Sequence, residues 1–202
     1  MTSNFPIDKP SIILGSTSPY RRELLLKLGL EFDTAVPDID ESPEPNEQPS
    51  QLVERLARLK AAAVADNHPY ALIIGSDQVA TIEGEILGKP GNQATATEQL
   101  LLASGKKVTF YTGLCLLNSK SGHSQVCCEP FHVYFRELDE EEIQNYLVRE
   151  APYNCAGSFK SEGLGITLFR KMEGEDPNSL IGLPLIRLLE MLRREGINPL
   201  KR

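Results

Sequence analysis

Two adjacent arginines follow a hydroxyl-rich loop near the start of the chain. Residues 11–28 read SIILGSTSPYRRELLLKL, in which an apolar strand leads into a loop and a helix is predicted to begin after Ser18. Arg21 and Arg22 then fall in the first helical turn, where the helix dipole is already positive. A bound anion would remove this conflict, because phosphate oxygens accept from N-terminal amides, from the Ser16 hydroxyl and from guanidinium groups. The pattern indicates a polyphosphate site, and the alternative is a pair of solvated surface arginines.

A carboxylate follows a predicted buried strand in the sequence IIGSDQV. Asp77 comes shortly after the apolar run 71–74, which is typical of a strand covered on both faces. A buried carboxylate is costly unless it is paired or holds a metal ion. Asp77 is therefore the strongest acidic candidate in the chain, and the alternative is a strand-end aspartate that faces solvent.

A second group of acids lies in a proline-rich loop. Asp38, Asp40 and Glu41 are close together in the sequence DIDES. Oxygen ligands near a phosphate site are what Mg²⁺ or Mn²⁺ requires, although most such clusters are solvated loops. Lys60 and Lys89 read, from the residues alone, as ordinary surface lysines.

The rest of the chain alternates between predicted helices and strands. Helices are predicted over 52–65, 97–103, 138–149 and 183–195, and strands over 71–74, 79–82, 108–117, 125–135 and 166–169. Ser50 is the expected N-cap of the first of these helices. The turn NSKSGHS joins the two long β-rich segments, which favours an antiparallel hairpin. No linker or repeat divides residues 1–202, so we expect one α/β domain with a mixed sheet.

Composition limits the classes of function. The net charge is -7, which argues against binding to polymeric nucleic acid or to anionic membranes. The N-terminal sequence lacks the pattern of a signal peptide, and no apolar run approaches the roughly 20 residues that cross a bilayer, so a cytoplasmic location is expected. The four cysteines show no C-x-x-C spacing and are expected to be reduced, structural thiols.

Five motifs together resemble the Maf family of nucleoside triphosphate pyrophosphatases. In chain order they are STSPYRRELL, DIDE, RLA-x-x-K-A at 55–61, GSDQ at 75–78 and GKP at 88–90. The resemblance covers nearly the whole chain. It implies an elongated central mixed β-sheet flanked by helices, with two lobes and a cleft between them, as in the ITPase-like fold. It also implies hydrolysis of a nucleotide between its α- and β-phosphates with Mg²⁺ or Mn²⁺.

The same resemblance assigns roles to the matching residues. Those implied to face the triphosphate are cations and one hydroxyl: Ser16, Arg21, Arg22, Lys60 and Lys89. Glu41 and Asp77 are implied to hold the metal ion, and Asp77 is also implied to be the proton acceptor that activates water.

Within the family, the chain is most similar to the branch that acts on 7-methyl-GTP. The specificity positions of that branch are matched by Tyr20, Gln78 and Glu162, although the branch usually has Trp where this chain has Tyr20. Methylation at N7 makes guanine cationic, so an aromatic face can hold it by a cation–π attraction of roughly 0.5 to 2 kcal/mol. Glu162 can accept from the N1 and N2 donors of the base.

The resemblance therefore implies that 7-methyl-GTP is converted to 7-methyl-GMP and pyrophosphate. One alternative is the same chemistry on dTTP or UTP, which another branch favours. A second alternative is a non-catalytic, nucleotide-sensing regulator of cell division. The sequence leaves open whether the protein is a monomer or a homodimer.

Overall fold

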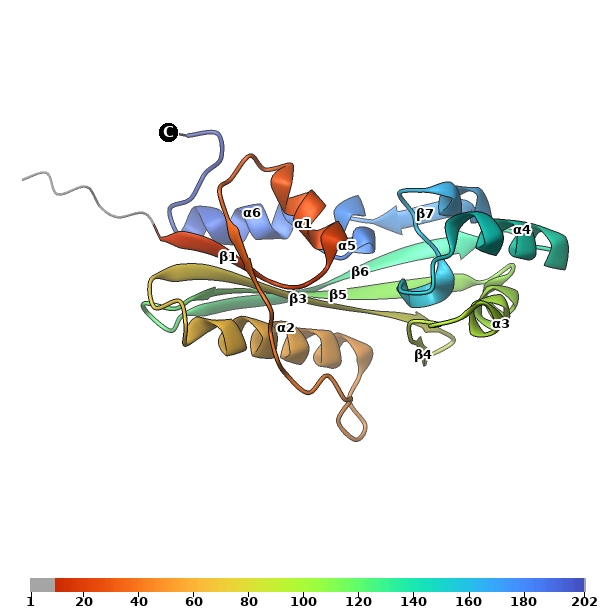
Figure 1. Cartoon of the computed structure of the whole chain (residues 1–202), viewed down its shortest axis with the longest axis horizontal. Helices are drawn as coiled ribbons and strands as arrows, with labels where there is room; N and C mark the ends of the chain where they lie inside the picture. Colours follow the sequence, from red (N-terminus) through yellow and green to blue (C-terminus); the bar gives the residue numbers. More distant parts are fainter. Residues whose placement is uncertain (1–9, 202) are drawn as a thin grey trace, which may run out of the picture.

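One long strand, β3, runs through the centre of the molecule (Figure 1). The computed structural model describes residues 10–201, and in this part of the chain seven strands form one sheet in the order β2-β1-β3-β5-β6-β7, with β4 paired to β3. The strands are β1 (Ser11–Gly15), β2 (Asp33–Ala35), β3 (Ala71–Ile82), β4 (Glu85–Leu87), β5 (Lys107–Asn118), β6 (Ser124–Phe135) and β7 (Phe169–Gly174). β1 pairs in parallel with β2 and β3, and the remaining pairs are antiparallel. The predicted mixed sheet is confirmed.

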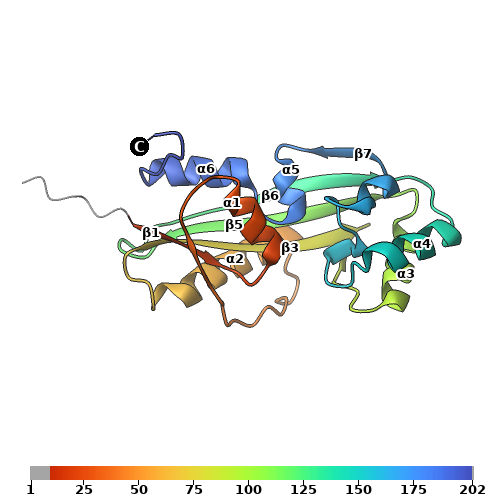
Figure 2. The ribbon, with the colours of Figure 1, turned by 45° about the horizontal axis from the view of Figure 1, so that its top comes forward.

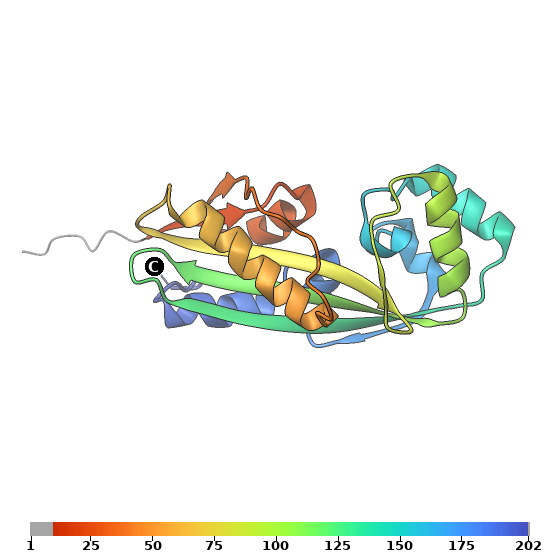
Figure 3. The ribbon, with the colours of Figure 1, turned by 90° about the horizontal axis from the view of Figure 1, so that it is seen from below.

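Helices cover both faces of the sheet. α2 (Pro49–Ala65) lies on one face, whereas α1 (Pro19–Leu26), α5 (Pro177–Ile181) and α6 (Leu185–Arg194) lie on the other (Figures 1 and 3). α3 (Gln93–Ala103) and α4 (Glu140–Glu150) gather at the far end of the long strands as a second lobe (Figure 2). This lobe has its own apolar core, separate from the two clusters that lie under α2 and under α1 and α6.

β3 has a continuous partner on one edge and an interrupted one on the other. β5 pairs with it from Leu72 to Ile82. On the opposite edge, β1 pairs with residues 71–75 and β4 pairs with residues 80–82. Within the described chain, residues 76–79 therefore have no strand partner on that edge. The gap lies between the lobe that contains β1 and the lobe that contains β4 (Figure 1).

Two glycines bring α2 very close to the sheet. A Cβ atom on Gly75 would lie 2.1 Å from the carbonyl oxygen of Ala57, and one on Gly113 would lie 2.0 Å from that of Val53. Both clashes would be with helix backbone, which cannot rotate out of the way as a side chain can. The helix therefore packs directly against the backbone of β3 and β5, and its side chains reach the sheet.

Most elements lie where the sequence predicts them, including the hairpin of β5 and β6 and the cap of α1. The Ser18 hydroxyl accepts from the N–H of Arg21 at the start of that helix. The predicted cap at Ser50 is wrong, because Pro49 occupies the first helical position and Gln48 precedes it.

The strand predicted over 166–169 is also wrong. Residues Leu164–Leu168 form a 3₁₀ turn that follows a tight loop, in which the N–H groups of Gly163 and Gly165 both donate to the carbonyl of Lys160. The strand itself is β7, an exposed edge strand with the sequence FRKMEG, whose polar residues concealed it.

Three further expectations concern membrane-spanning helices, the N-terminal segment and the cysteines. No helix in residues 10–201 is long and apolar enough to cross a membrane. The prediction that the N-terminal segment carries no signal peptide concerns residues 1–9, which lie outside the described part. The four cysteines are free thiols, as predicted.

Replacement of Gly75 by alanine should displace α2 from the sheet. An overpacked contact with backbone costs about 1–3 kcal/mol of unfolding free energy, and urea denaturation would measure this loss. Gly88→Ala is the matched control, because a Cβ at Gly88 would meet no atom within 4 Å. An unchanged denaturation midpoint for Gly75→Ala would contradict the close packing described above.

Candidate active site

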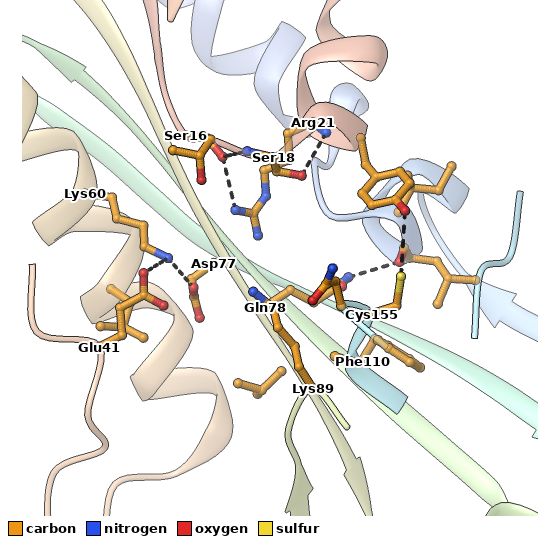
Figure 4. Close-up of a pocket in the computed structure, with 18 of the residues that line it drawn as sticks. Ser16, Ser18, Arg21, Glu41, Lys60, Asp77, Gln78, Lys89, Phe110 and Cys155 are labelled. Atoms are coloured by element: carbon orange, nitrogen blue, oxygen red, sulfur yellow. Dashed lines mark hydrogen bonds and ion pairs between the residues drawn. The ribbon is translucent and has the colours of Figure 1, made fainter. Parts of the chain in front are cut away.

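A cavity of about 750 Å³ opens between the two lobes at the gap in the edge of β3 (Figure 4). Nine of the ten predicted site residues line it: Ser16, Tyr20, Arg21, Glu41, Lys60, Asp77, Gln78, Lys89 and Glu162. Arg22 is exposed on α1 and is not among the lining residues in the described chain. Of the three neighbouring acids in the proline-rich loop, only Glu41 lines the cavity.

A buried ion pair forms one wall of the cavity. The Nζ atom of Lys60 lies 2.6 Å from Oδ1 of Asp77 and 3.0 Å from Oε1 of Glu41. Lys60 and Asp77 are 5% and 7% exposed, so the interpretation of Lys60 as a surface lysine, made from the residues alone, is wrong. The close packing of α2 on the sheet explains this, since it places the lysine beside the strand that carries Asp77.

The two carboxylates suit a divalent cation. Oxygens of Glu41 and Asp77 converge on a single positive group, the ammonium of Lys60, so they already surround a position favourable to positive charge. No group of three or more His, Cys, Asp or Glu that could hold a metal is found in residues 10–201. A Mg²⁺ or Mn²⁺ ion held here would therefore complete its oxygen ligands with phosphate and water, as Mg²⁺ commonly does.

An arginine clamp holds the loop that carries Glu41. Arg55 of α2 donates to both carboxylate oxygens of Glu47, at 2.6 and 2.8 Å, and to the carbonyl of Ser42 at 3.0 Å. The hydrogen bonds from Arg55 lower the pKa of Glu47 to about 2. The clamp ties both sides of a loop that has no regular structure of its own, and it thereby limits where Glu41 can lie.

Arg21 is anchored beside the Ser16 hydroxyl, in the loop that precedes α1. Its Nε atom donates to the carbonyl of Gly182 at 2.8 Å, and its Nη1 atom lies 3.5 Å from the Ser16 hydroxyl. Burial lowers the pKa of Arg21, and the negative charges of Asp77 and Glu41 act in the opposite direction. An arginine remains charged near neutral pH in spite of such a shift. Lys89 also lines the cavity, and unlike Lys60 it is exposed.

The opposite end of the cavity is aromatic. Its lining includes the rings of Tyr20, Phe110 and Phe159, together with Cys155 and Glu162. Burial, with Cys155 nearby, raises the pKa of Tyr20 to about 12, so its phenol is neutral at physiological pH. Figure 4 shows Glu41, Lys60 and Asp77 on one side of the cavity, Phe110 and Cys155 on the other, and Gln78 between them.

Sequence reasoning missed the segment that connects these parts. Residues 176–182, DPNSLIG, include the short helix α5, which the sequence analysis does not predict. Its carbonyl groups accept hydrogen bonds from Arg21, Ser76 and Gln78. The overlooked signal is Asp176 followed by a proline, because this pair is typical of a helix N-cap and first turn.

The chain has an α/β fold whose cleft is lined by cations and carboxylates at one end and by aromatic rings at the other. The family profile described as "Maf-like protein" matches residues 11–195, and the chain belongs to this family.

The chain has two further similarities to known proteins, one in sequence and one in fold. The chain is 60% identical over 188 residues to the 7-methyl-GTP pyrophosphatase of Alcanivorax borkumensis, and the match covers 93% of this chain and 95% of that protein. The structure is similar to that of the Staphylococcus aureus Ham1 protein, with a TM-score of 0.50 and 14% identity over 93% of this chain and 100% of the other. At this low identity the second similarity concerns the fold alone, and it confirms the predicted architecture.

Loss of the arginine clamp should weaken the site without unfolding the protein. Arg55→Met frees the loop that carries Glu41, so the concentration of Mg²⁺ needed for half-maximal activity should rise about tenfold, as for residues that orient a metal ligand. Arg58→Met removes the same charge from an exposed position of α2 and serves as the control.

The clamp also has a defined pH range. Because the pKa of Glu47 is lowered to about 2, its carboxylate is ionised at every pH above the ordinary pKa of glutamate. The ion pair with Arg55 therefore holds the loop throughout that range and is lost only as the pH falls toward 2. Limited proteolysis of the loop should therefore be uniformly slow from pH 5 to 8 in the wild type and faster in Arg55→Met. Equal proteolysis of the two proteins would contradict the clamp.

Proposed function

We propose that the protein hydrolyses 7-methyl-GTP to 7-methyl-GMP and pyrophosphate. The observation that carries the proposal is the ion pair of the buried Lys60 and Asp77, joined by the exposed Glu41, in the same cavity as the aromatic rings. This cavity offers charge for a triphosphate at one end and an aromatic lining for a base at the other. The 60% identity to a protein named 7-methyl-GTP pyrophosphatase supports this choice of substrate.

The phosphate end would perform the hydrolysis. Asp77 accepts a proton from a water molecule, whose oxygen attacks the α-phosphorus, and the bond to the bridging oxygen breaks so that pyrophosphate leaves. Arg21, Lys60 and Lys89 offset the negative charge on the leaving group. The Ser16 hydroxyl and the N-terminus of α1 orient the phosphates.

Glu41 and Asp77 would hold the divalent metal. When bound there, Mg²⁺ or Mn²⁺ supplies positive charge at the phosphate oxygens and makes a bound water more acidic. A phosphate contact of Arg22 stays a prediction, because this residue is exposed on the outer side of α1. The cytoplasmic location also stays a prediction.

The base end would recognise a methylated purine. The ring of Tyr20 can stack on the cationic base, and its phenol stays neutral because the pKa is raised to about 12. Glu162 is exposed at the cavity and can accept from donors on the base edge or balance the positive charge.

Replacement of Asp77 by asparagine tests the assigned base. The variant keeps the shape of the side chain but cannot take up the proton, so kcat should fall at least about a hundredfold. Titration calorimetry with 7-methyl-GTP should still show binding. Asp38→Asn is the matched control, because it makes the same substitution at an aspartate outside the cavity, and it should leave kcat unchanged. Near-normal turnover in Asp77→Asn would rule out the proposed mechanism.

A substrate panel tests the choice of base and the need for a metal. We expect kcat/KM, measured by pyrophosphate release, to be highest for 7-methyl-GTP among 7-methyl-GTP, GTP, dTTP and UTP. Addition of EDTA should stop the reaction, and excess Mg²⁺ or Mn²⁺ should restore it. A preference for pyrimidines would overturn the substrate assignment. Binding without any product, unaffected by EDTA, would favour the nucleotide-sensing alternative.

A further inference from the structure

Three acceptors hold the amide nitrogen of Gln78 at the wall of the cavity. The Nε2 atom lies 2.9 Å from Oγ1 of Thr112, 2.8 Å from the carbonyl oxygen of Ser179 and 3.1 Å from that of Leu180. Carbonyl oxygens can only accept, so the NH₂ group must face α5 and both of its hydrogens are engaged there.

Thr112 helps to determine which way the Gln78 amide group faces. It is fully buried and lies directly opposite Gln78 in the register of β3 and β5. Its hydroxyl donates to the carbonyl of Ser179 at 2.8 Å. Because the single hydroxyl hydrogen is used in that bond, Thr112 meets Gln78 with a lone pair. A flipped amide, with its oxygen toward Thr112 and α5, would face only acceptors and would be repelled.

The carbonyl oxygen of Gln78 is thereby left for the cavity. No donor in residues 10–201 lies within hydrogen-bond distance of Oε1, and no buried side-chain polar atom in this part of the chain lacks a partner, so Oε1 is open to solvent. Gln78 lies between the Asp77 side and the aromatic side of the cavity (Figure 4). The cavity wall therefore presents an acceptor at this position.

We propose that Thr112 is a positioning residue for base selectivity, which keeps the Gln78 carbonyl oxygen directed toward the nucleotide. This inference rests on the proposed function, because it identifies how the same cavity would favour guanine over uracil. Guanine carries N1–H and N2–H donors side by side, whereas uracil and thymine have a carbonyl on each side of one N–H. A fixed acceptor at Gln78 matches the first edge and opposes the carbonyls of the second.

A double-mutant cycle tests this role. Thr112→Val keeps the shape of the side chain and removes the hydroxyl, so the Gln78 amide loses one of its three acceptors and is held less firmly by the two carbonyl groups that remain. We expect kcat/KM for 7-methyl-GTP to fall about tenfold, the size of one hydrogen bond, mainly through KM. For UTP it should change less than about threefold. Thr112→Ser, which retains the hydroxyl, should behave like the wild type.

The coupling between the two residues separates positioning from general damage to the fold. In a Gln78→Met background, Thr112→Val should have no further effect on selectivity, because no amide remains to be held. Equal losses of kcat/KM for 7-methyl-GTP and UTP would overturn the proposal. So would a loss of selectivity from Thr112→Val in the Gln78→Met background that is as large as its loss in the wild-type background. Wild-type kinetics of Thr112→Val would also overturn it.

Gln78→Glu provides a second test if Thr112→Val does not fold. It keeps acceptor oxygens at the cavity but has no N–H to donate to Ser179 and Leu180. Loss of selectivity in this variant supports the need for a held amide, and full selectivity contradicts it. The wild-type substrate panel alone decides the proposed function. The coupling of Thr112 and Gln78 can be measured on whichever nucleotide the wild type prefers, so the two failures are distinguishable.

Discussion

The contact between α2 and the backbone of two strands determines where the charged groups of this protein meet. Gly75 and Gly113 leave no side chain between helix and sheet, so Lys60 can reach Asp77 in a buried setting. A side chain at either glycine would move the helix outward. Burial of an ammonium group is tolerable here because two carboxylates surround it, and the pair would be costly if either charge were unmatched.

The interrupted edge of β3 explains how one strand serves both ends of the cavity. Adjacent residues of a strand point to opposite faces, so Asp77 faces α2 and Gln78 faces α5. In a fully paired sheet these two side chains would belong to separate layers. Since residues 76–79 have no neighbour on one edge, both faces open into the same cavity. The residues proposed for hydrolysis and for recognition of the base, Asp77 and Gln78, are thus consecutive in the chain.

Much of this arrangement could be predicted from the sequence, and the limits are instructive. The strand, loop and helix around Arg21 followed from local patterns, because capping and helix-dipole effects act within a few residues. The burial of Lys60 did not, since it depends on glycines that lie far away in the chain. The roles of Arg55, Thr112 and α5 also escaped. Their side chains act through hydrogen bonds to distant residues, which leave no periodic pattern in the sequence.

The long strands also restrict how the two lobes can move relative to each other. β3, β5 and β6 each run for 12 residues through both lobes, and their pairing is continuous where the lobes meet (Figures 1 and 3). A large change in the angle between the lobes would have to bend or break these paired strands, so the sheet limits how far the cleft can widen or narrow.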